Sequence, residues 1–208
     1  MKSKVDTKKS ETEKILKAAR QYVFKHGFRS LALDKLAIKL GMSVRSIYEH
    51  YHGKPLLITA VINDKMSEMD HDLEAIHSED LTFIESMQMM LDTLYKHSRE
   101  YSQVYIHDLT GNTTLFEWTR KLRRQMLERH FTEFFELGQR EKTIRNDISA
   151  EMFNEVYLSL TNGLIIGNIL KKTKGSNVCE VHKALFSMLL EGVLIRQSEP
   201  VPSRKKKK

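Results

Sequence analysis

Apolar residues recur every three or four positions through most of the chain, which is the period of an amphipathic α-helix. One such set lies between Leu33 and Leu40, and the next lies between Val44 and Tyr51. No alternating pattern of useful length indicates a strand, and only three prolines occur, two of them near the C-terminus. The pattern therefore predicts an all-α fold of about nine helices.

Capping residues and helix breakers set the expected helix boundaries. The first helix is expected to begin in a capping box, in which the Ser10 hydroxyl and the Glu13 carboxylate satisfy free amides, and to end at Gly27. Asp80 and Ser149 are the expected caps of two later helices. The remaining helices are expected at about residues 54–76, 101–109, 114–140 and 177–197, and the helix after Ser149 is expected to continue to about residue 171.

Residues 27–57 hold the clearest functional pattern. Two short helical segments are separated by Gly41-Met42-Ser43, and a long helix opens at Lys54-Pro55. Two short helices joined by such a turn form a helix-turn-helix, whose second helix can enter a DNA major groove. We therefore expect residues 1–57 to form a DNA-binding domain.

The charge distribution agrees with this expectation. Residues 1–60 hold 13 Lys/Arg and 5 Asp/Glu, a formal net charge of +8, whereas residues 61–203 hold 16 and 22. A phosphate backbone attracts the first segment and is repelled by the second. We expect residues 58–197 to form a second, helical domain. Residues 198–208 are expected to be a disordered basic tail, which either adds DNA affinity or only aids solubility.

Composition and motifs exclude several classes of protein. No run of about 18 apolar residues predicts a membrane span, and the N-terminus has no apolar signal segment. A single cysteine, Cys179, cannot form an internal disulfide, so a cytoplasmic location is expected. No motif of a hydrolase, nucleotide-binding enzyme or metalloprotease occurs, and we expect neither enzyme activity nor a cofactor. His50 and His52 lack a third ligand at metal-site spacing, so no metal is expected.

Several short patterns at fixed spacing are those of a known family. They are Ile15-Leu16-x-Ala18-Ala19, Phe24-x-x-Gly27-Phe28, Leu36-Ala37, Gly41-Met42-Ser43, Ile47-Tyr48-x-His50-Tyr51 and Lys54-x-x-Leu57. In these positions the chain resembles the TetR-type (tetracycline-repressor-like) transcriptional regulators. The resemblance covers about the first 57 residues, and the rest of the chain is similar only in the number and order of its helices.

The resemblance implies a homodimer that places the third helix of each subunit in a major groove of a palindromic, double-stranded DNA operator. The implied DNA contacts are Val44, Arg45, Ser46, Tyr48, His50 and Lys54. Lys54 would hold a phosphate at the start of the fourth helix. Arg45 would read a base, since its planar guanidinium suits guanine O6 and N7. Tyr51 is interpreted as a core residue, whereas Tyr48 could be either core or contact.

One departure from the family pattern concerns the start of the second helix. Relatives usually carry Thr there, whereas this chain has Leu31-Ala32-Leu33 and leaves Ser30 as the nearest hydroxyl. The missing cap predicts a helix start weaker by about 1 kcal/mol. Arg45 is a second departure, because relatives often have a small residue at this position.

In the C-terminal domain the resemblance implies an effector pocket and a dimer interface made by the last two helices. The candidate pocket residues are Met66, Met87, Met90, Tyr95, Tyr105, His107, Trp118 and Phe131. The candidate interface residues are Val156, Leu160, Gly163, Leu164, Gly167, Leu185, Met188, Leu189 and Gly192. Methionine and aromatic side chains are also typical of ordinary cores, and an intrachain core is the alternative for both sets. An effector would be small and apolar or amphipathic.

These observations favour a ligand-responsive, homodimeric transcriptional repressor. The alternative is a DNA-bound scaffold, or a division or chromosome-organisation factor, whose body binds a protein instead of a small molecule. A closed and fully packed body would favour the alternative.

Overall fold

The computed structural model describes residues 4–166 and 178–194, and within these residues the chain forms nine helices and no strand. The helices are α1 (Lys4–His26), α2 (Leu33–Leu40), α3 (Val44–Tyr51), α4 (Lys54–His77), α5 (Phe83–Ser98), α6 (Gln103–Thr110), α7 (Thr113–Arg140), α8 (Ala150–Ile166) and α10 (Val178–Val193). The predicted all-α fold is confirmed for this part of the chain. None of these helices is long and apolar enough to cross a membrane.

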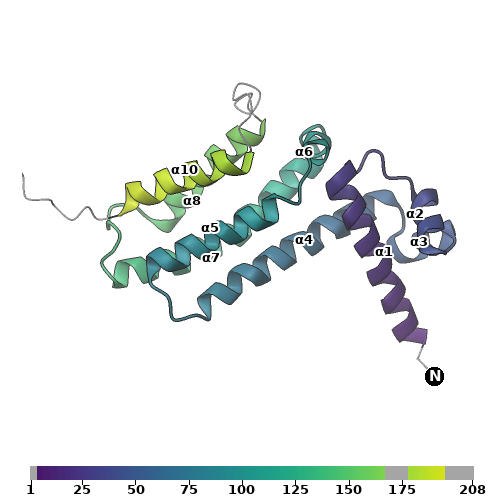
Figure 1. Ribbon diagram of the computed structural model, residues 1–208, viewed down its shortest axis with the longest axis horizontal. Coiled ribbons are helices and arrows are strands. Elements are labelled where there is room, and N and C mark those ends of the chain that lie inside the picture. Colours follow the sequence, from purple (N-terminus) through teal and green to yellow (C-terminus); the bar gives the residue numbers. More distant parts are fainter. Residues whose placement is uncertain (1–3, 167–177, 195–208) are drawn as a thin grey trace, which may run out of the picture.

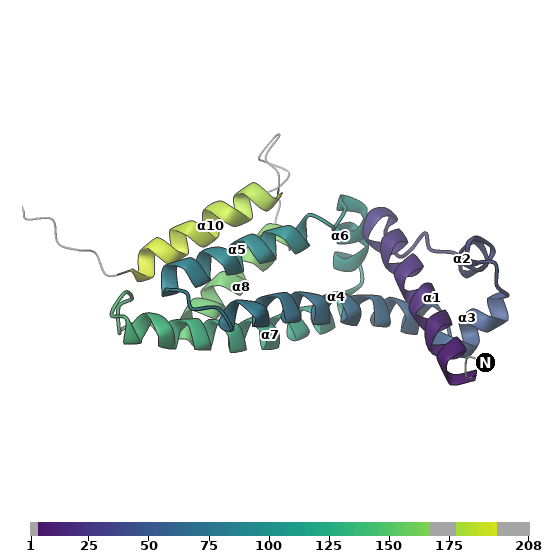
Figure 2. The same cartoon turned by 60° about the horizontal axis from the view of Figure 1, so that its bottom comes forward.

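The molecule is elongated, with α1, α2 and α3 at one end and a helical body at the other (Figure 1). The body consists of α5, α7, α8 and α10, and α4 runs from the three N-terminal helices along it (Figures 1 and 2). α4 contacts α1 at one end and both α5 and α7 at the other. The short helix α6 packs against α1, where the two parts meet.

Two hydrophobic cores correspond to these two parts. The N-terminal core collects buried side chains of α1 to α4 together with Tyr105, Leu109 and Phe116, which come from α6 and α7. The C-terminal core is formed by the second half of α4 with α5, α7, α8 and α10. Met66 on α4 packs against both cores. A displacement of α4 in the body would therefore also change its packing against the N-terminal helices.

Two predicted helix starts are wrong, and one is confirmed. α1 continues back to Lys4, so Ser10 lies exposed inside the helix instead of capping it. α5 begins after Thr82 instead of Asp80, because Thr82 and Glu85 form a capping box two residues further on. Ser149 does cap α8, since its Oγ accepts the amide of Met152 at 3.1 Å. The predicted helix ends near residues 171 and 197 lie outside the described residues.

Candidate DNA-binding site

The turn between α2 and α3 is held by backbone geometry and by one side-chain cap. Gly41 ends α2 in the left-handed conformation (φ 66°), which brings its amide to the carbonyls of Ala37 and Ile38. Ser43 begins α3, and its Oγ accepts the amide of Ser46 at 3.0 Å. These contacts fix the angle at which α3 leaves the turn.

The start of α2 lacks such a cap. Its N-cap residue is Ala32, which makes no side-chain hydrogen bond. Ser30 does not replace the cap, because its Oγ donates to the carbonyl of His26. The expected absence of a cap on α2 is therefore confirmed.

α3 has one buried anchor and an exposed opposite side. Ile47 is fully buried in the N-terminal core, while Val44 and Ser46 are half-buried. The Arg45 side chain is 88% exposed, and among the described residues it forms an ion pair with Glu49 one turn later, at 2.9 Å. An exposed ion pair of this kind contributes little to the free energy of folding, so the guanidinium can leave Glu49 for another partner. Tyr48 is 49% exposed, which places it on the surface instead of in the core.

His50 and Tyr51 hold α3 against α1. His50 Nδ1 lies 2.8 Å from Thr12 Oγ1, its Nε2 lies 3.2 Å from Glu11 Oε2, and its side chain is 5% exposed. The Tyr51 hydroxyl donates to the carbonyl of Thr12 at 3.0 Å. The expectation that His50 contacts DNA does not fit this placement, because both ring nitrogens already face partners on α1. His50 holds α3 against α1.

Lys54 lies in the first turn of α4, after Gly53 (φ 121°). Its ammonium donates to the carbonyl of Arg29 at 2.8 Å, and the residue as a whole is half-buried. An ammonium has three donors, so two protons remain for a phosphate at this helix N-terminus. The same contact ties the start of α4 to the loop between α1 and α2.

That loop is also fastened to α6 of the body. Asp108 accepts the backbone amide of Arg29 at 2.8 Å, and the Arg29 side chain donates to the carbonyl of Gly111 at 2.9 Å. Gly27 has φ 77°, and a Cβ built on it would lie 2.4 Å from Asp108 Oδ2. Only glycine allows α6 to approach the end of α1 this closely.

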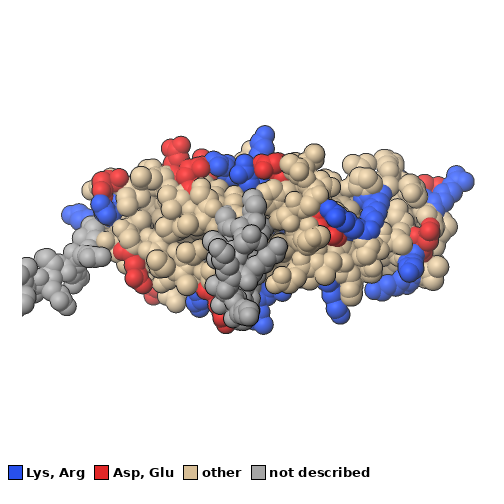
Figure 3. All heavy atoms as spheres, turned by 90° about the horizontal axis from the view of Figure 1, so that it is seen from above, with Lys and Arg blue, Asp and Glu red and all other residues tan. Residues whose placement is uncertain are grey.

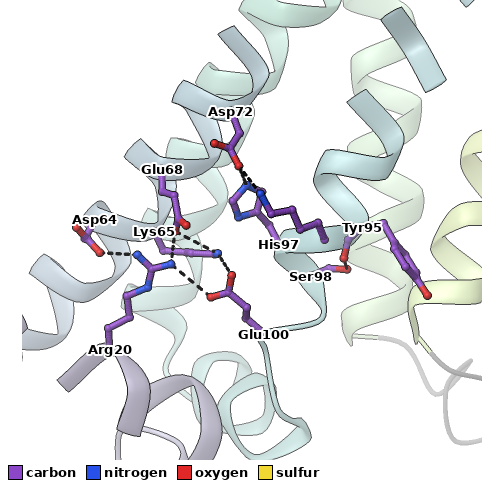
Figure 4. A network of polar contacts seen from close by, with 10 residues as sticks. Arg20, Asp64, Lys65, Glu68, Asp72, Tyr95, His97, Ser98 and Glu100 are labelled. Carbon is purple, nitrogen blue, oxygen red and sulfur yellow. Dashed lines mark hydrogen bonds and ion pairs between the residues drawn. The ribbon is translucent and has the colours of Figure 1, made fainter. Parts of the chain in front are cut away.

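A second polar connection, here called the junction cluster, lies between α1, α4 and the end of α5 (Figure 4). It consists of Arg20, Asp64, Lys65, Glu68, Asp72, His97 and Glu100. Arg20 on α1 forms ion pairs with Asp64, Glu68 and Glu100. Burial opposes the ionisation of Glu68, but hydrogen bonds and charges from Arg20 and Lys65 outweigh it and hold the pKa of Glu68 below its usual value.

Neither connection was predicted from the sequence. Arg29 and Asp108 are separated by 79 positions, and Lys65 and Glu100 by 35. Charged residues on a helix are usually solvated, and no local pattern distinguishes those that meet a partner from a distant helix. The sequence gives one signal for these connections, which is the glycine that ends α1. Gly27 has a positive φ in the structure.

The predicted pocket residues are divided between the two cores. Met87, Met90 and Phe131 are fully buried in the C-terminal core, whereas Tyr105 is buried in the N-terminal core and Trp118 packs against it. The remaining three are Met66, which packs against both cores, Tyr95, which is half-buried, and His107, which is exposed on α6.

The predicted interface residues include an exposed apolar stripe. Val156 and Leu160 on α8 are 41% and 38% exposed, and Met152 continues the same face at four-residue spacing with 56%. Met188 on α10 is 68% exposed. Leu185 and Leu189 are half-buried, and Gly192 is exposed. Gly163, Leu164 and Gly167 lie outside the residues whose side chains the structure describes.

Surface charge differs between the two ends of the molecule. Lys and Arg side chains are prominent around the end that carries α1 to α3, whereas Asp and Glu are interspersed with them over the body (Figure 3). The formal net charge of residues 1–60, which hold 13 Lys/Arg and 5 Asp/Glu, attracts a polyanion to this end.

Comparison with known proteins identifies the N-terminal part. Residues 15–61 match the family model described as "Bacterial regulatory proteins, tetR family". This segment runs from α1 to the start of α4 and includes the whole helix-turn-helix. No curated protein matches the sequence.

The whole chain is similar in fold to solved regulators. A transcriptional regulator from Cytophaga hutchinsonii ATCC 33406 has a TM-score of 0.76 at 14% identity, with 89% of this chain and 99% of that chain covered. A TetR-family regulator from Agrobacterium tumefaciens has a TM-score of 0.68 at 15% identity, covering 90% and 100%. A putative transcriptional regulator from Saccharomonospora viridis, solved in complex with choline, has a TM-score of 0.68 at 18% identity, covering 90% and 100%.

The exposed α3 agrees with the family match, which identifies residues 15–61 as similar to the DNA-binding part of the tetR-family bacterial regulatory proteins, and the chain as a whole has the fold of solved transcriptional regulators.

Proposed function

We propose that the chain is a homodimeric, ligand-responsive repressor that acts in the cytoplasm on a palindromic operator. This proposal rests on the exposed side of α3, where Arg45 and Tyr48 lie. The side chains of Ile47 and His50 are buried on the other side and fix the helix to the N-terminal core and to α1. Val44, Ser46 and Lys54 complete the proposed DNA contacts. The proposed domains are residues 1–57 for DNA binding and 58–197 for the effector and the dimer, followed by the tail 198–208.

Footprinting on the chain's own promoter, followed by Arg45→Ala, tests the DNA contact. Loss of a bidentate contact to a base should weaken binding by about 1–3 kcal/mol and relax the preference at one base pair. Arg140→Ala is a matched control, since Arg140 is also exposed and paired with a glutamate one turn away, but on the body. Unchanged affinity and base preference in Arg45→Ala would refute the assignment.

The apolar stripe of Met152, Val156 and Leu160, with Met188, supports the dimer, because exposed apolar surface of this kind is typical of subunit interfaces. Leu160→Glu should convert the dimer to a monomer in sedimentation equilibrium. Ile38→Glu is the control, since Ile38 is 79% exposed but lies on α2 at the opposite end. A monomeric wild type, or a Leu160→Glu variant that stays dimeric, would contradict this interface.

The effector is proposed to be small and apolar or amphipathic. The similar Saccharomonospora regulator was solved in complex with choline, a small amphipathic cation, which supports an effector of this class. Complete burial of Met87, Met90 and Phe131 favours the second candidate, a DNA-bound scaffold with a protein partner, because these side chains already fill the C-terminal core. Gel shifts with a panel of small molecules separate the two, since a scaffold's operator affinity would respond to none of them.

A further inference from the structure

A buried nitrogen of the junction cluster has no hydrogen-bond partner among the described residues. It is Nδ1 of His97, whose side chain is 1% exposed. The other ring nitrogen, Nε2, lies 3.1 Å from Asp72 Oδ2. A carboxylate can only accept, so the ring proton is on Nε2 and Nδ1 carries a lone pair. In the neutral ring, Nδ1 is therefore free to bind a metal ion.

Two carboxylates lie beside the His97 ring. Glu68, His97 and Glu100 each place one ligand-type atom within 4.8 Å of the others. Figure 4 shows the free ring nitrogen of His97 on the side that faces Glu68 and the end of the Lys65 side chain. One imidazole with carboxylates, plus water in an open position, is a ligand set that zinc accepts. Asp72 makes the outer hydrogen bond that metal-binding histidines almost always have.

At present a lysine ammonium lies between the two carboxylates. The Lys65 side chain is 1% exposed, and its Nζ lies 2.5 Å from Glu100 Oε1 and 3.3 Å from Glu68 Oε2. The cluster has more carboxylates than cations. The carboxylates are Asp64, Glu68, Asp72 and Glu100, and the cations that contact them are Arg20, Lys65 and Lys96. The site therefore already attracts positive charge and retains one uncompensated negative charge while His97 is neutral.

We propose that Glu68, His97 and Glu100 form a regulatory site for a divalent transition-metal ion, of which Zn²⁺ fits best, and that the metal competes with Lys65 for the two carboxylates. The imidazole nitrogen favours such an ion over Mg²⁺ and Ca²⁺, which take oxygen ligands. The site uses α4 and the end of α5, directly beside Arg20 of α1.

Metal binding would alter the connection between the body and the DNA-binding end. Glu68 and Glu100 are two of the three carboxylates that hold Arg20, so their transfer to a metal leaves Asp64 as its remaining ion-pair partner in the cluster. α1 would then be held less firmly to α4, and operator affinity would fall by about fivefold or more. This consequence rests on the proposed function, whereas metal binding itself does not.

Calorimetric titration of the full-length, metal-free chain with Zn²⁺ tests the site. Wild type should bind one Zn²⁺ per chain at this site and should not respond to Mg²⁺. Glu100→Gln should lose this binding, and because the Glu100 side chain is 40% exposed, its replacement leaves core packing in place. Glu79→Gln, an exposed carboxylate in the turn after α4, is the matched control and should bind as wild type.

Two further variants separate ligation from a general effect of charge. Asp72→Ala should weaken Zn²⁺ binding by about 10–100-fold, because it removes the outer hydrogen bond to His97. Lys65→Met should tighten Zn²⁺ binding by about tenfold, because the competing ammonium is gone. Weaker binding in Lys65→Met, with helical content unchanged by circular dichroism, would overturn the competition. Absence of saturable Zn²⁺ binding, or equal binding by wild type and Glu100→Gln, would overturn the site.

Operator binding is measured in the same samples with and without Zn²⁺. A bound metal that leaves operator affinity unchanged overturns the regulatory link but not the site. A chain that binds no DNA under either condition contradicts the proposed function, while the calorimetric result still decides the metal site.

Discussion

The close approach of α6 to the end of α1 predicts that Gly27→Ala is far more damaging than an otherwise similar change at Gly41. Both glycines have positive φ, 77° at Gly27 and 66° at Gly41. An alanine in this conformation costs about 1–2 kcal/mol at either position. A Cβ at Gly41 would meet nothing within 4 Å, so the backbone term is the whole expected effect there.

At Gly27 a steric term is added. The new Cβ would lie 2.4 Å from Asp108 Oδ2 and 2.9 Å from Val104 Cγ1, so α6 has to move. Moving Asp108 breaks its hydrogen bond to the Arg29 amide, and a buried group left without its partner costs about 1–3 kcal/mol. We therefore expect Gly27→Ala to lower the free energy of unfolding by about 2–5 kcal/mol, against about 1–2 kcal/mol for Gly41→Ala.

Urea unfolding of the two variants and of wild type measures the difference, provided that the m-values agree. The double variant Gly27→Ala, Asp108→Ala should be less destabilised than the sum of the two single variants, because removal of the carboxylate relieves the clash. Equal losses in Gly27→Ala and Gly41→Ala would refute the reasoning, since only the contact with α6 distinguishes the two positions.

Three other predictions concern capping, packing and pH. Ala32→Ser should stabilise the protein by about 1 kcal/mol in urea unfolding, because Ala32 has the extended conformation of an N-cap (φ −105°, ψ 123°) but no acceptor; no gain would mean that the first amides of α2 are already satisfied. Phe186→Ala should cost about 3–5 kcal/mol, since this ring of α10 is fully buried; a loss below about 1 kcal/mol would mean that α10 is not packed on the body. Burial lowers the pKa of both His77 and His97 below 6.5, so as the pH falls the unfolded chain takes up protons at these rings before the folded chain does. The free energy of unfolding should therefore fall as the pH decreases below about 6.5. A free energy of unfolding that stays constant from there to about pH 5 would contradict the burial of these rings.

Local patterns were sufficient to predict the helices and the helix-turn-helix. Helical periodicity depends on neighbours three and four positions apart, so the apolar faces of α2 and α3 can be read from the sequence alone. The turn at Gly41 and the cap at Ser43 are equally local. Errors occurred where two local signals compete, as at α5, where Asp80 and Thr82 are both good caps and only Thr82 has a glutamate three residues later.

Contacts between distant residues were decided only by the tertiary structure. His50 matches a family motif that suggests a DNA contact, yet its ring lies between Thr12 and Glu11 of α1. Lys65 occurs in a polar stretch of α4 that looks solvated, yet its ammonium is buried between carboxylates from α4 and the end of α5. The sequence by itself determined the all-helical fold and the position of the recognition helix, because both follow from the spacing of neighbours along one helix. Which polar side chains connect the DNA-binding end to the body depends on how whole helices pack, because a charged residue has the same local pattern whether it faces water or a partner from another helix.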